Sequence, residues 1–203
     1  VRITGPLAHV LVTQNFVNNT QVNGRGVFAF PLPDKTTIDA LTITAGERRM
    51  EGRIVRYDDA AQMQQLLTSA GFPASLHAAT SSGAPVISID RIDAGEHVTV
   101  RFEYVQRLAS SSGPQRFEFP LMRYEGAHRS RLHTANLETA AQPGGNSDPA
   151  SPVSMRIWLN AGFSLGKVVS PTHAISVRKA SDGSVMLSLA HARIRTDRNF
   201  VLT

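Results

Sequence analysis

The chain contains no cysteine among its 203 residues. This absence excludes disulfide bonds, thiolate nucleophiles and zinc sites built on cysteine. No run of about 18 apolar residues occurs, so the sequence predicts no membrane-spanning helix. The N-terminal residues carry no apolar stretch of the kind found in signal peptides. Because the chain lacks an initiator Met and stops within the apolar run 200–202, we expect it to be a segment of a longer protein.

Short motifs that mark common catalytic sites are also missing. The sequence has no Gly-x-Ser-x-Gly elbow, no glycine-rich phosphate loop and no dinucleotide-binding fingerprint. Its 7 histidines show neither His-x-x-x-His nor His-Glu-x-x-His spacing, so no zinc site is expected. We therefore predict a non-catalytic protein without metal or cofactor. A hydrolase with an unrecognised His, Asp and Ser site remains the alternative.

Lysine is scarce, although the chain carries a net charge of +5. Of the 21 basic residues, all are arginine except Lys35, Lys167 and Lys179. A positive surface suits an anionic partner. The arginines are scattered along the chain, however, and we attribute them to a genome rich in G and C. An anion-binding module for acidic glycan or nucleic acid is kept as an alternative function, with nucleic acid the less favoured partner.

What the sequence does have is alternation with a period of two residues. Between His97 and Tyr104, apolar and polar side chains alternate, and the same pattern returns at 153–159 and 185–189. Weaker patterns predict strands at 7–16, 26–30, 36–44, 48–55, 85–92, 115–119, 163–170, 173–177 and 198–202. The dipeptides Asn23-Gly24 and Asp182-Gly183 are typical of tight hairpins. The predicted fold class is all-β, a mostly antiparallel β-sandwich.

One segment departs from this pattern and predicts an amphipathic helix near 58–70. Asp58 or Asp59 can cap its N-terminus, Gly71 suits its end, and an apolar stripe follows at helical spacing. A second segment, 135–151, is rich in Gly, Pro and Asn and predicts a flexible linker. The predicted organisation is a β domain at 1–134, the linker at 135–151, and further strands at 152–203. These last strands either pack on the first domain or lead into another domain.

Several motifs occur in the order and spacing of one known family. Gln14-Asn15-Phe16-Val17-Asn18 and Val27-Phe28-Ala29-Phe30-Pro31-Leu32-Pro33 end two strands. A Gly-centred strand at 51–55 precedes the helix, Ala74-Ser75-Leu76 follows it, and the turn 92–96 leads into the strand 98–104. Over about residues 7–125 the chain resembles the vault protein inter-alpha-trypsin (VIT) domain. Residues 170–173 and 197–202 resemble the stretch that joins a VIT domain to a von Willebrand factor A domain, with Asn199 where the family more often has Asp.

The residues that carry this resemblance are expected to serve the architecture and not a reaction. Phe16, Phe28 and Phe30 are core candidates, and prolines that cannot donate to a ladder end the strand before them. Gln14 and Asn18 can pair with backbone groups at a strand end. The full set of motif residues is Gln14, Phe16, Asn18, Phe28, Phe30, Pro31, Leu32, Pro33, Gly71, Tyr104, His173 and Phe200.

The resemblance implies a function as well as a fold. A VIT domain of this kind would be a non-catalytic interaction or scaffolding module in a secreted or surface-anchored protein, similar to inter-alpha-trypsin inhibitor heavy chains. Its expected partners are an adjacent von Willebrand A domain and an unidentified protein or matrix component. Exposed strand edges are the physical means that we favour, because an unpaired edge offers a row of donors and acceptors.

Overall fold

The computed structural model describes residues 1–29, 32–33, 36–52, 74–77, 86–109, 114–121, 131–134, 150–163, 165–195 and 197–203. The described residues contain no helix, and the fold is all-β as predicted. None of them forms a helix long and apolar enough to cross a membrane. The helix predicted near 58–70 lies outside the described residues, as do Phe30, Pro31 and Gly71. The predicted linker also lies outside them, except for Ala150 and Ser151, which belong to a strand.

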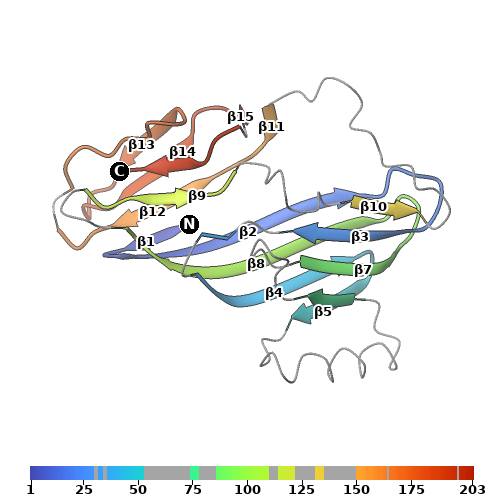
Figure 1. Ribbon diagram of the computed structural model, residues 1–203. Helices are drawn as coiled ribbons and strands as arrows, with labels where there is room; N and C mark the ends of the chain where they lie inside the picture. The colour runs from blue at the N-terminus through green and yellow to red at the C-terminus, as the bar shows by residue number, and fades with distance from the viewer. Residues whose placement is uncertain are drawn as a thin grey trace.

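The strands of the first half are β1 Arg2–Thr4, β2 Leu7–Val17, β3 Gly24–Ala29, β4 Thr37–Ala45, β5 Arg48–Gly52, β6 Ala74–His77, β7 Val86–Ile92 and β8 His97–Arg107. Those of the second half are β9 Phe117–Phe119, β10 Arg131–Thr134, β11 Ala150–Pro152, β12 Arg156–Asn160, β13 Ile175–Lys179, β14 Val185–Leu189, β15 Arg193–Arg195 and β16 Phe200–Leu202. Figure 1 shows β12, β13 and β14 gathered at one end of the long strands β2 and β8, with β3 and β7 toward the other end.

The main sheet has eight strands in the order β13-β14-β12-β1-β2-β8-β4-β5. Its pairings are antiparallel except for β1 beside β12, so the sheet is mostly antiparallel as predicted. A four-stranded sheet has the order β10-β3-β7-β6, and the pairs β11-β15 and β16-β9 complete the described part.

Strand β8 is the clearest case of sequence dictating structure. Its apolar residues Val98, Val100, Phe102 and Tyr104 are all buried, while the polar residues between them lie on the other face. Because side chains alternate across a strand, this pattern fixes which face of β8 meets the core. Strands β2 and β4 pair along almost the whole of β8 and continue the same buried face.

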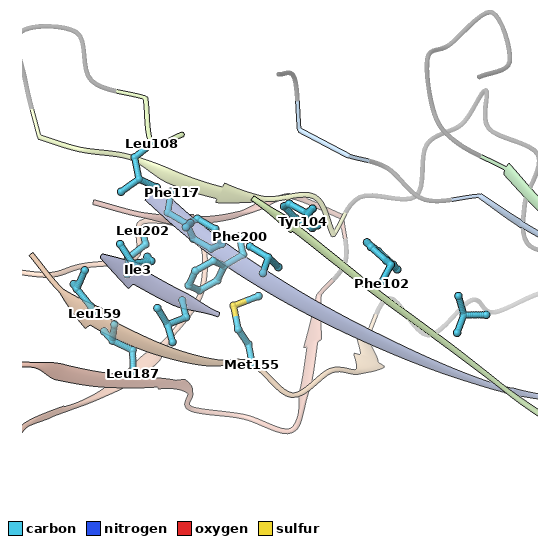
Figure 2. Packing of buried hydrophobic residues seen from close by; sticks show 14 of the residues in the cluster. Ile3, Phe102, Tyr104, Leu108, Phe117, Met155, Leu159, Leu187, Phe200 and Leu202 are labelled. Atoms are coloured by element: carbon cyan, nitrogen blue, oxygen red, sulfur yellow. The ribbon is translucent and has the colours of Figure 1, made fainter. Parts of the chain in front are cut away.

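The core lies between the main sheet and the smaller ones. Ile89 and Ile92 of β7 belong to the same buried cluster as the inner face of the main sheet. Phe117 of β9 and Phe200 of β16 join it from the other small pair, with ring centroids 6.4 Å apart in an edge-to-face arrangement. Figure 2 shows these two rings beside Ile3 and the side chains that β12 and β14 contribute. Strands β7, β9 and β16 therefore pack on one face of the main sheet, and side chains of β2 that point to the opposite face, such as Leu7 and Leu11, are exposed.

Strands β12, β13 and β14 belong to the main sheet, whereas β15 pairs with β11 and β16 pairs with β9. Ile3 in β1 pairs with Leu159 in β12 on one side and with Ala8 in β2 on the other. This three-residue strand consequently connects β12, β14 and β13 to the sheet formed by β2, β8, β4 and β5. Strands β12, β14 and β13 thus extend the sheet that β1, β2, β8, β4 and β5 form.

Two predicted details are wrong. The dipeptide Asn23-Gly24 forms no hairpin, because β2 and β3 belong to different sheets and the loop between them is a crossover. Residues 165–170 of the segment predicted as a strand at 163–170 form no strand, although Val169 exchanges backbone hydrogen bonds of 2.9 and 3.0 Å with Thr203. Asp182-Gly183 does turn the β13–β14 hairpin, where Gly183 has a φ of 81°.

Candidate interaction surface

Asn18 joins three segments at the end of β2. Its side-chain amide donates hydrogen bonds to the carbonyl oxygens of Val22, Ile92 and Asp93, at 2.9, 3.1 and 3.0 Å. Its side-chain oxygen accepts from the backbone N–H and the hydroxyl of Thr20, at 3.1 and 2.7 Å. The residue is fully buried, and every polar atom of its side chain is used. The expected pairing of Asn18 with backbone outside the ladder is therefore present, and it fixes the crossover from β2 to β3.

An ion pair holds the next turn at the same end of the molecule. The guanidinium of Arg48 in β5 contacts both carboxylate oxygens of Glu96, at 2.7 and 2.8 Å, and donates to the carbonyl of Arg91. Glu96 also accepts the backbone N–H of Asp93 at 2.7 Å. Sequence reasoning placed Glu96 in a family turn but missed Arg48. No sequence spacing links the two, because β5 and the β7–β8 turn meet only through the folded sheet.

Three further motif residues, Phe16, Leu32 and Tyr104, lie in or against the core. Tyr104 is buried, and Phe16 and Leu32 are half-buried and pack on the buried cluster. Gln14 and Pro33 are half-buried, and Phe28 belongs to β3. Desolvation raises the pKa of the Tyr104 phenol well above its usual range. These positions support the architecture and present no cluster of reactive groups.

The second motif region ties the chain end to the core. The hydroxyl of Thr172 accepts the backbone N–H of Val201 at 3.0 Å, and the ring of His173 lies 5.8 Å from that of Phe200. The Nδ1 atom of His173 lies 3.0 Å from the Thr172 hydroxyl. Within the described residues, no group of three or more His, Asp or Glu side chains could hold a metal ion.

Asn199, the residue that departs from the family pattern, also has a structural contact. Its side-chain amide donates to a carboxylate oxygen of Glu118 in β9 at 2.8 Å. This hydrogen bond, with a further contribution from Arg116, lowers the pKa of the Glu118 carboxyl. An Asp at this position would instead face the Glu118 carboxylate with a like charge.

The solvent face of the main sheet carries an arginine–tryptophan row, which consists of Arg178, Met186, Trp158 and Arg2 on four neighbouring strands. The guanidinium of Arg2 lies 5.2 Å from the centre of the Trp158 ring, within the range of a cation–π contact. Met186 is 44% exposed. No carboxylate of the described chain pairs with Arg178. The row therefore offers unneutralised positive charge beside apolar surface.

Strand β13 forms one margin of the main sheet (Figure 1) and pairs only with β14 among the described strands. Residues 176–179 are all exposed, and Val177 retains 44% of its surface. The strand therefore presents an open edge whose side chains are basic on one end and apolar in the middle. The arrangement can pair with another extended chain, whereas it holds no nucleophile aligned with a base.

Comparison with known proteins places the chain in a family. A search of curated proteins finds no match to the chain. A sequence model of the vault protein inter-alpha-trypsin domain matches residues 1–104, which run from β1 into the middle of β8. VIT domains are in general non-catalytic interaction or scaffolding modules, and they are found in extracellular proteins. The match covers half of the sequence, and the chain belongs to the VIT domain family.

Proposed function

We propose that the chain is a non-catalytic scaffolding module of a secreted or surface-anchored multidomain protein, and that it positions an adjacent von Willebrand A domain. The observation that carries this proposal is that the β1–β12 ladder joins β12, β13 and β14 of the second half of the chain to strands of the first half in one sheet. A module built in this way holds strands from both halves of the chain in one sheet, which can support a neighbouring domain.

The anchoring of β16 supports the same proposal. Phe200, Val201 and Leu202 are all buried, β16 pairs with β9, and Thr203 exchanges backbone hydrogen bonds with Val169. A domain that followed Thr203 would start from a fixed strand rather than a free tail. The orientation of that following domain relative to this module would then be restricted, because a short connection from a fixed strand leaves few directions open.

Spin labels can test this positioning in the parent protein. The chain has no cysteine, so Thr13→Cys on the exposed face of β2 provides one labelling site, and a second is placed in the domain after Thr203. We expect a single narrow distance distribution that Phe200→Ala broadens and that Val22→Ala, in an exposed loop, leaves unchanged. A broad distribution in the unsubstituted protein, or a following sequence unrelated to A domains, would overturn the proposal.

An anion-binding module is the second candidate, and the arginine–tryptophan row favours it. Phosphate or sulfate groups bound there would release counterions, so binding would weaken steeply as salt rises. Heparin binding at about 50 mM salt, reduced by Arg2→Ala together with Arg178→Ala, would support this function. Absence of binding at that salt concentration would remove it.

A further inference from the structure

The hydrogen-bonding groups of β13 divide into two sets. In an antiparallel pair, residues alternate between those that exchange backbone hydrogen bonds across the pair and those that do not. The N–H of Ala180 donates to Ser184 at 2.8 Å, and the N–H of Ala190 donates to Ala174 at 3.0 Å. Ser176 and Arg178 lie two and four residues after Ala174, so by this alternation their backbone N–H and C=O groups also point toward β14.

The remaining residues of β13, Ile175, Val177 and Lys179, direct their N–H and C=O groups away from β14. No hydrogen bond to these outward groups occurs in the described part of the chain. Exposure of residues 176–179 shows that neighbouring segments leave this stretch of the edge open. An extended chain can therefore add to the sheet here with regular backbone pairing.

The two faces of the edge differ in chemistry. On the inner face, Val177 lies opposite Leu187, which is 1% exposed, whereas Val177 itself is 44% exposed. An apolar side chain placed beside Val177 would extend the buried row and cover that surface. On the solvent face, Arg178 lies opposite Met186 and carries an unneutralised charge. A carboxylate placed beside Arg178 would pair with it.

Charge decides between an acidic strand and a second copy of this chain. Arg178 and the adjacent Lys179 place two positive charges at the end of the edge, and the whole chain carries +5. Basic residues on an edge are a common means by which proteins avoid pairing with themselves. The same charges attract an acidic strand, so the edge discriminates in favour of an oppositely charged partner.

We infer that β13 is a docking edge for an extended acidic segment of a protein partner, in which an apolar side chain lies beside Val177 and carboxylates lie beside Arg178 and Lys179. The inference rests on the proposed function, because it specifies the partner chemistry of an interaction module. In an antiparallel arrangement, the partner sequence from N- to C-terminus would be acidic, acidic, apolar, polar, apolar, with its residues opposite 179, 178, 177, 176 and 175 in that order.

A capped peptide with the core Asp-Glu-Val-Thr-Val tests the inference against the whole chain. Amide hydrogen exchange, followed by NMR, is expected to slow at Ile175, Val177 and Lys179 when the peptide binds. The amides of Ser176 and Arg178 already face β14 and should change little. A Lys-Lys-Val-Thr-Val peptide is the matched control and should give no protection.

Two substitutions separate backbone pairing from charge. Val177→Pro removes one outward N–H and is expected to abolish peptide binding, while Val177→Ala keeps the N–H and retains binding. Proline is tolerated on an edge where its N–H would face solvent, and unchanged amide signals of β8 would show that the fold persists. Arg178→Glu should weaken binding of the acidic peptide about tenfold or more and strengthen binding of the basic peptide.

Several results would overturn the inference. They are protection with the basic peptide only, equal binding by Val177→Pro, absence of protection at every peptide concentration, and protection that rises with protein concentration alone. The last result would identify a second copy as the occupant. The spin-label distances depend on β16 and the following domain, and they are independent of peptide binding at β13. The two experiments therefore distinguish failure of the docking inference from failure of the proposed scaffolding role.

Discussion

Arg48 and Glu96, 48 residues apart in the sequence, form a bidentate contact in which one guanidinium nitrogen lies 2.7 and 2.8 Å from the two carboxylate oxygens. The side chain of Glu96 is only 12% exposed and that of Arg48 34% exposed. The same carboxylate accepts the backbone N–H of Asp93. The pair therefore fastens the edge strand β5 to the β7–β8 turn beside Asn18.

Removal of the Glu96 carboxylate is the first prediction. Glu96→Ala should lower the free energy of unfolding by about 1–3 kcal/mol, because Arg48 and the N–H of Asp93 both lose their acceptor. Chemical denaturation measures this loss. The matched control is Glu51→Ala, which breaks the Arg49–Glu51 pair at 3.1 Å, where the side chains are 67% and 71% exposed. That change should cost less than about 1 kcal/mol, and equal losses at the two sites would contradict the assignment.

A pair of glycines gives the second prediction. Gly5 and Gly46 have similar positive φ values, 53° and 55°, so alanine is strained at either site. A Cβ on Gly46 would lie 2.8 Å from a Glu96 carboxylate oxygen, whereas nothing lies within 4 Å of one on Gly5. Gly5→Ala should cost about 1–2 kcal/mol in unfolding free energy from backbone strain alone. Gly46→Ala should cost more, and the excess should disappear in a Glu96→Ala background. An excess that persists there would show that the crowding has another source.

The sequence predicted the long strands because alternation needs several residues to become visible. Strand β8 has eleven residues, and the pattern alone correctly predicted the shared face of Val98, Val100, Phe102 and Tyr104 but not the burial of Gln106. Strand β1 has three residues, too few to show alternation, yet it joins the C-terminal strands to the main sheet. The organisation of the chain depends on this short strand, and its pairing with β12 is set by tertiary packing.

The candidate site shows a similar division. Asn18 was identified from a local motif, since its hydrogen bonds follow from its place at a strand end. Arg48, Trp158 and Arg178 were not singled out, because their significance comes from cross-strand register. The scattered arginines of the sequence become a partial row only when β13, β14, β12 and β1 lie side by side. No sequence spacing could have revealed this arrangement.

The hydroxyl of Tyr104 leads to the third prediction. This oxygen is buried and has no hydrogen-bond partner within the described residues, and burial raises the pKa of the phenol. Tyr104→Phe removes the unpaired polar atom and keeps the ring, so the free energy of unfolding should stay equal or rise by up to about 1–3 kcal/mol. Tyr104→Ala removes the ring as well and should cost about 3–5 kcal/mol. A loss of more than about 1 kcal/mol in Tyr104→Phe would show that the hydroxyl is hydrogen-bonded.

Acid titration gives the fourth prediction, which concerns Glu118. The hydrogen bond from Asn199, together with Arg116, holds the pKa of this carboxyl below its ordinary value of 4.5. A carboxyl whose pKa is lower in the folded state stabilises the fold above the unfolded-state pKa, and this stabilisation is lost as pH falls through the folded-state value. The stability difference between the unsubstituted chain and Glu118→Gln should therefore be present at neutral pH and shrink below pH 4.5.

The size of this effect is limited by solvent, because 40% of the Glu118 side chain is exposed. NMR titration of the Glu118 carboxyl carbon provides the direct measurement, and Asn199→Ala should raise its pKa toward the ordinary value. Glu51→Gln removes a more exposed carboxylate and serves as the control for a change in net charge. A stability difference that grows as the solution becomes more acidic would mean that the folded state favours the protonated Glu118 carboxyl, and that its pKa is raised on folding. Asn199 could then not be the group that stabilises the charged Glu118 carboxylate.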